Sequence, residues 1–189
     1  MARTALSPRE AAGVLHADLC ASRSLVPVTP PVAGLLPEPG EWALGVFARS
    51  DVDYARYCGT DVVYWTNGPA VVFGSPQFLA GYALGSVVQQ ARLRRKARRL
   101  ASPQWRSFPL GCTVVTNRRL WCQVDGQWVN FDYDTITGYD LSNITLTVSF
   151  VQATPLRISG PWALWIGAAV AHLRYGPSVA ARIPALAAL

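Results

Sequence analysis

The densest group of chemically active side chains lies between residues 92 and 99, where six of eight positions are basic. Guanidinium groups pair with the oxygens of phosphates and carboxylates, so this run favours an anionic partner. Drawn as a helix over about residues 86–101, it has a narrow apolar stripe that can dock on a domain. The opposite face either binds phospholipid head groups or nucleic-acid phosphates, or is simply solvated. The basic side chains are Arg92, Arg94, Arg95, Lys96, Arg98 and Arg99.

A second basic pair, Arg118 and Arg119, lies in a Thr-Asn-Arg-Arg-Leu segment between two predicted strands. We include both arginines in the expected anion-binding set, because their forked donors match phosphate and carboxylate oxygens. The alternative is structural. In that case the two side chains bond backbone carbonyls, or pair with Asp132 and Asp134 at the end of the sheet.

Metal and catalytic chemistry have weaker support in the sequence. The four cysteines include no C-x-x-C pair, and His16 and His172 are remote in sequence, so the zinc signal is weak. We interpret His16 as a solvated residue of the first helix, and the cysteines as buried free thiols. The sequence contains no G-x-S-x-G, P-loop or H-E-x-x-H motif. We therefore expect no catalytic residue, no metal, no cofactor and no enzymatic activity.

The elements that must position these groups are organised around residues 113–131. Asp125-Gly126 lies between two alternating segments, which is typical of a two-residue type I′ hairpin turn. The turn predicts three cross-strand pairs: Val124–Gln127, Cys122–Val129 and Leu120–Phe131. One face of this hairpin then belongs to the core, and the other carries Trp121 and Trp128.

The N-terminal part of the chain contains a helix and a spacer. Within residues 1–25, Ser7-Pro8-Arg9-Glu10 is a capping box that opens a helix ending near Cys20, with Val14 and Leu15 among its inward residues. Residues 26–40 are rich in proline and form an extended strap. Further strands are predicted at 41–47, 61–66, 70–73, 135–139, 144–150 and 155–158.

The C-terminal part is predicted to close the sheet. Pro161 begins an amphipathic helix whose apolar face carries Trp162 and Ile166, and Gly176-Pro177 ends it. Residues 177–189 form an alanine-rich tail.

The composition is globular, with 51% hydrophobic and 15% charged residues and a net charge of +6. Residues 69–88 are nearly uncharged and precede the basic run, as in a membrane span. A buried strand followed by a loop explains them better, because glycines and Pro76 interrupt the segment. We expect a cytoplasmic protein, with the peripheral inner membrane face as a second location.

The order of these elements resembles GRAM and bacterial PH-like domains, in particular those of actinobacteria and their phages. The resemblance rests on Glu38-Pro39-Gly40-Glu41 ahead of a strand, the Thr-Asn-Arg-Arg-Leu turn, Asp134-Thr135-Ile136-Thr137 and the terminal helix, and it covers about residues 38–175. It implies an α+β, mainly β fold, in which a PH-like curved barrel or sandwich over residues 41–176 is capped by the C-terminal helix. The N-terminal helix and the inserted basic helix depart from this pattern.

The resemblance also implies a non-enzymatic adaptor that engages a protein partner or the anionic inner membrane surface, here through the arginine-rich helix. Two alternatives remain open. The same helix could bind nucleic acid without sequence preference, or the chain could be a phage or prophage protein that binds a host factor.

Overall fold

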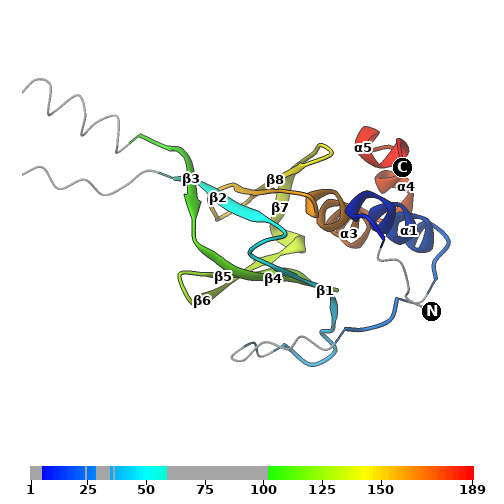
Figure 1. Ribbon diagram of the computed structural model, residues 1–189, viewed down its shortest axis with the longest axis horizontal. Coiled ribbons are helices and arrows are strands. Elements are labelled where there is room, and N and C mark those ends of the chain that lie inside the picture. The colour runs from blue at the N-terminus through cyan, green and yellow to red at the C-terminus, as the bar shows by residue number, and fades with distance from the viewer. Residues whose placement is uncertain (1–5, 24, 29–34, 36, 59–101) are drawn as a thin grey trace, which may run out of the picture. The chain divides into compact units, whose positions relative to one another are not determined.

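The computed structural model describes residues 6–23, 25–28, 35, 37–58 and 102–189 (Figure 1). The chain divides into two units, residues 1–56 with 106–189, and residues 57–105. The predicted strands at 61–66 and 70–73, the uncharged stretch and the basic helix all lie outside the described residues. In the second unit, the rings of Tyr57 and Trp105 lie edge to face, with centroids 5.6 Å apart.

The first sheet is antiparallel and contains the predicted hairpin. Its strand order is β1 (Ala43–Ala48), β4 (Leu110–Thr116), β5 (Arg119–Val124) and β6 (Gln127–Asp132). The three predicted cross-strand pairs are confirmed, from Val124 opposite Gln127 to Leu120 opposite Phe131. Asp125 and Gly126 both have positive φ, at 49° and 78°, as a type I′ turn requires.

The second sheet has five strands in the order β3 (Gln104–Phe108), β2 (Asp53–Cys58), β9 (Leu156–Ser159), β8 (Thr145–Phe150) and β7 (Ile136–Leu141). A short 3-10 helix, η1 (Tyr133–Thr135), leads from β6 into β7. Strands β7, β8 and β9 match three sequence predictions within two residues at each end. Phe131 of the first sheet stacks on Phe150 of the second, with ring centroids 5.2 Å apart, so the inner faces share one core.

Helix α3 (Ala163–Tyr175) packs against this core and is buried on nearly all sides. The sequence predicts an amphipathic helix, but nine of its thirteen residues are buried. The difference arises because α3 contacts β7, β8 and η1 and also packs against the helices α1 and α4. The rings of Trp162 and Trp165 lie 5.4 and 5.0 Å from that of Phe47, which anchors the start of the helix to β1.

Helix α1 (Pro8–Cys20) begins with the predicted capping box. The Ser7 hydroxyl accepts from the Glu10 N–H, and the Glu10 carboxylate accepts from the Ser7 N–H at 2.8 Å. The expected inward face is wrong in one respect: Val14 is exposed, whereas Ala12 is fully buried beside Leu15. Packing against α3 selects a stripe that differs from the one that periodicity indicates.

The alanine-rich tail forms two short helices, α4 (Pro177–Ala180) and α5 (Pro184–Ala187), whose Ala180 and Leu186 join the core. Together with α1 and α3, they gather at one end of the strands (Figure 1). The described residues therefore form an α+β, mainly β fold with two antiparallel sheets. These described strands do not close into a barrel.

Candidate functional site

Six of the eight predicted anion-binding residues, those between Arg92 and Arg99, lie outside the described residues. The other two, Arg118 and Arg119, lie in the turn that joins β4 to β5. This turn is held rigidly from within. The Thr116 hydroxyl accepts from the N–H groups of Arg118 and Arg119 at 3.2 and 3.0 Å. Asn117 exchanges two hydrogen bonds with the backbone of Trp42, at 3.0 and 3.1 Å.

The guanidinium group of Arg119 is surrounded by carboxylates. It lies 2.7 Å from Glu38, 3.0 Å from Asp132 and 3.6 Å from Glu41, and its side chain is only 12% exposed. It also lies over the ring of Trp121, 5.6 Å from the centroid. Burial lowers the pKa of Arg119, but the three carboxylates raise it by more than burial lowers it. The pKa therefore lies above its ordinary value, and the group remains a cation.

Arg118 is less constrained than Arg119. Its side chain is 51% exposed and pairs with Glu38 at 3.1 Å. Asp134, the other acid considered as a partner for this arginine pair, faces Arg174 at 3.7 Å. Arg119 therefore forms the ion pair with Asp132 that the structural alternative predicts, whereas the head group of Arg118 is half exposed.

The Glu41 carboxylate is the buried centre of this arginine–carboxylate cluster. Its Oε1 accepts from the Thr116 hydroxyl at 2.7 Å and from the Trp121 indole N–H at 3.0 Å, and its Oε2 accepts from the Glu38 N–H at 3.1 Å. Burial raises the pKa of Glu41, but these hydrogen bonds and the charge of Arg119 outweigh it, so the pKa lies below its ordinary value. The cluster ties residues 38–42 to the β4–β5 turn.

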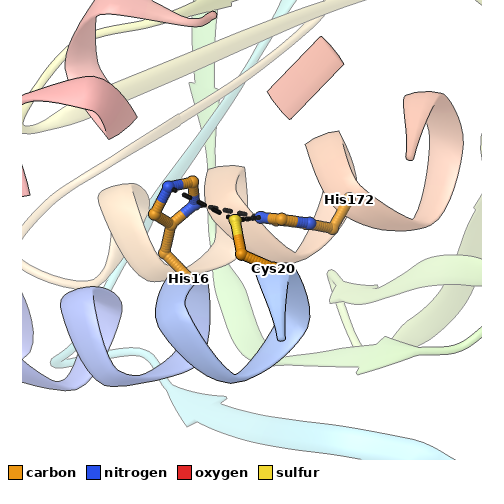
Figure 2. A group of neighbouring side chains, drawn as sticks. All are labelled: His16, Cys20 and His172. Atoms are coloured by element: carbon orange, nitrogen blue, oxygen red, sulfur yellow. Dashed lines mark hydrogen bonds between the residues drawn. The ribbon is translucent and has the colours of Figure 1, made fainter. Parts of the chain in front are cut away.

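A second polar group joins the two long helices. His16 and Cys20 are four residues apart on α1, so their side chains share one face one turn apart. His172 projects toward them from α3 (Figure 2). The Nδ1 atom of His16 lies 2.9 Å from the Nε2 atom of His172. The Cys20 Sγ atom lies 3.8 Å from His16 Nε2 and 4.0 Å from His172 Nε2.

The exposure of the three side chains in this histidine–cysteine cluster increases from the core toward the solvent. His172 is 7% exposed, His16 is half-buried and Cys20 is exposed. Burial lowers the pKa of His172, and the neighbouring His16 lowers it further. The buried Nδ1 atom of His172 has no hydrogen-bond partner among the described residues. His16, which the sequence predicts to be solvated, is half-buried and lies within hydrogen-bonding distance of His172. Cys122 is buried as predicted, but Cys20 is exposed.

Donor chemistry makes this cluster the candidate metal centre of the described chain. One ligand atom from each of the three residues lies within 4.8 Å of the others. The i, i+4 spacing of His16 and Cys20 is visible in the sequence, but His172 is 156 positions away, and only the packing of α3 on α1 brings it close.

No protein-family model and no curated protein matches the chain. Among its described helices, none has the length and apolar character that crossing a bilayer requires.

Proposed function

We propose that this chain is a non-enzymatic binding module that attaches to an anionic surface through residues 92–99. The surface is the inner face of a membrane or an acidic protein partner. The observation that carries the proposal is the distribution of charge. The chain has 17 basic and 11 acidic residues, and six of the basic ones lie between Arg92 and Arg99. The 11 basic residues that remain balance the 11 acidic ones, so one eight-residue segment accounts for the whole net charge of +6.

The ion pairs elsewhere support this division of roles. Arg119 and Arg118 face carboxylates within the arginine–carboxylate cluster, and Arg23 pairs with Asp18 at 2.8 Å. A balanced body with one concentrated cationic segment attracts an anionic surface mainly through that segment, over a screening length of about 8–10 Å at physiological salt. Near an anionic membrane each basic residue contributes about 1 kcal/mol, so six provide at most about 6 kcal/mol.

Vesicle flotation with the full-length protein tests the proposal. We expect the protein to float with phosphatidylserine-containing vesicles and to stay behind with neutral phosphatidylcholine vesicles. The test variant R94Q/R95Q/K96Q removes three charges from the segment. It should weaken binding by about 3 kcal/mol, roughly two orders of magnitude.

The matched control is R23Q/R49Q/R182Q, which removes three charges from exposed positions outside the segment. It should retain binding, although both variants have the same net charge. Equal binding to neutral and anionic vesicles, or an equal loss in the control, would refute membrane attachment through residues 92–99.

Nucleic-acid binding is the second candidate, favoured by the same run of guanidinium groups. A gel shift at low salt distinguishes it. A retarded band would indicate nucleic-acid binding, and the logarithm of the binding constant should fall with the logarithm of the salt concentration by about 0.9 per phosphate contacted. This result, together with no binding to anionic vesicles, would assign the segment to nucleic acid.

A further inference from the structure

We propose that His16, Cys20 and His172 form a Zn²⁺ site that fixes helix α1 to helix α3 and leaves one coordination position open. The inference is independent of the anionic-surface proposal, because none of its residues belongs to the arginine-rich segment.

The donor set selects the metal. Two imidazole nitrogens and one thiolate are borderline to soft ligands, which zinc prefers, whereas calcium and magnesium take oxygen ligands. Zinc sites with three protein ligands of these types keep a fourth position for water or an external donor. Exposed Cys20 lies on the solvent side of the cluster, so the open position is reached from outside.

The distances fit tetrahedral coordination after small adjustments. With Zn–N of about 2.0–2.1 Å and Zn–S of about 2.3 Å, two nitrogens stand about 3.4 Å apart, and nitrogen and sulfur about 3.6 Å. In the structure His172 Nε2 lies 2.9 Å from a nitrogen of His16 and 4.0 Å from the Cys20 sulfur. Each separation differs from the tetrahedral value by about half an ångström. His16 presents one nitrogen to His172 and the other to Cys20 at 3.8 Å, so a small ring rotation chooses its ligand atom.

The three proposed ligands differ in burial, so His172 is held rigidly while His16 and Cys20 can adjust their positions. His172 is buried, and its neighbours on α3, Ala171 and Val170, are core residues, so packing holds its ring. Its Nδ1 has no hydrogen-bond partner among the described residues, so within this part of the chain packing orients the ring. The two ligands on α1 lie closer to the surface and can move onto the metal.

A metal ion bound between α1 and α3 would stabilise the docking of α1. The described contacts that hold α1 in place are chiefly with α3, and to a smaller extent with α4. A metal bound only by the docked arrangement stabilises that arrangement by mass action. Free Zn²⁺ at about a hundred times its Kd should raise the Tm by about 5–10 °C for a chain of this size.

Titration of the reduced, chelator-treated full-length protein tests the site. We expect one Zn²⁺ per chain by calorimetry, with release of a proton as the thiol becomes a thiolate. Co²⁺ serves as the spectroscopic probe, because a thiolate ligand adds a charge-transfer band and a tetrahedral field gives intense visible bands. Bound Zn²⁺ should also protect Cys20 from alkylation by iodoacetamide.

Cys20→Ser is the informative variant, because residue 20 is exposed at the end of α1 and the substitution leaves the core intact. It should abolish the Co²⁺ thiolate band and weaken Zn²⁺ binding by more than the roughly 10–100-fold typical of losing an outer-shell partner. The matched control is Cys112→Ser, which alters a free cysteine outside the cluster and should bind like the wild type. Circular dichroism checks that both variants fold.

Three results would overturn the proposal. The first is the absence of Zn²⁺ binding to the folded wild type at micromolar concentration. The second is an unchanged Co²⁺ band in Cys20→Ser, which would place the thiolate elsewhere. The third is equal loss of binding in Cys112→Ser.

Discussion

The arginine–carboxylate cluster makes a quantitative prediction for Glu41→Gln, a change of charge with almost no change of shape. The amide oxygen of the new side chain can still accept from Thr116 and Trp121, but its NH₂ group then meets the Glu38 N–H, donor against donor. An unsatisfied donor costs about 1–3 kcal/mol, and the two remaining bonds lose their charge assistance, worth about 1 kcal/mol each. Allowing for access of water to the Glu38 N–H, we expect a loss of about 2–4 kcal/mol.

The assay is thermal unfolding of the full-length protein at several pH values. At pH 7 the Tm of Glu41→Gln should lie about 4–16 °C below that of the wild type, since 1 kcal/mol shifts the Tm of such a chain by about 2–4 °C. The control Glu38→Gln removes a half-exposed carboxylate from the same cluster, and it should cost under about 1 kcal/mol.

The pH dependence supplies a second readout. The folded-state pKa of Glu41 lies below the ordinary value of 4.5, so the unfolded chain binds this proton more readily than the folded protein. Stability from this group is complete above pH 4.5 and is lost as pH falls through the folded-state value. The difference in Tm between wild type and Glu41→Gln should therefore narrow below about pH 4.5. Equal Tm values at pH 7, or a gap that does not change down to about pH 3, would refute the assigned role of the carboxylate.

Three further substitutions or labels test the packing. Gly160→Ala should lose about 2 kcal/mol or more in urea unfolding, because φ is 124° and the new Cβ would lie 2.8 Å from the Asp51 carbonyl oxygen; unchanged stability would contradict this backbone geometry. Leu146→Ala empties a fully buried position in β8 and should cost about 2–5 kcal/mol, measured in the same way, whereas a loss below about 1 kcal/mol would mean that the two sheets do not share this core. Burial raises the pKa of Cys122 to about 12, so mass spectrometry after iodoacetamide treatment at about pH 8 should find Cys122 unmodified in the folded protein and alkylated only after unfolding.

The elements that the sequence predicts correctly are specified by neighbours within a few residues. The Asp125-Gly126 turn fixes the register of β5 and β6, and Ser7 with Glu10 fixes the start of α1. Such signals depend on backbone conformation and short-range hydrogen bonds, so they can be recognised before the fold is known.

The candidate sites depend on partners that are distant in the chain. Glu41 and Thr116 are 75 positions apart, and His16 and His172 are 156 positions apart. Hydrophobic periodicity indicates which face of a helix is buried, but it does not indicate which polar residue of another helix will lie opposite. The buried Glu41 and the half-buried His16 therefore look like ordinary surface residues until α1, α3 and the two sheets are assembled.

Strand β1 determines which strand lies at one edge of the first sheet. It covers one side of β4, pairing from Ala43 opposite Thr116 to Ala48 opposite Cys112. Proteolysis that removed the residues before 49 would leave the β5–β6 hairpin intact but turn β4 into an open edge with unpaired N–H and C=O groups. The edge would then be the seven-residue β4, whose Val114 and Val115 are fully buried in the intact protein, in place of the six-residue β1. A longer apolar edge is a better template for strand addition, so the trimmed protein should self-associate more readily than the untrimmed one.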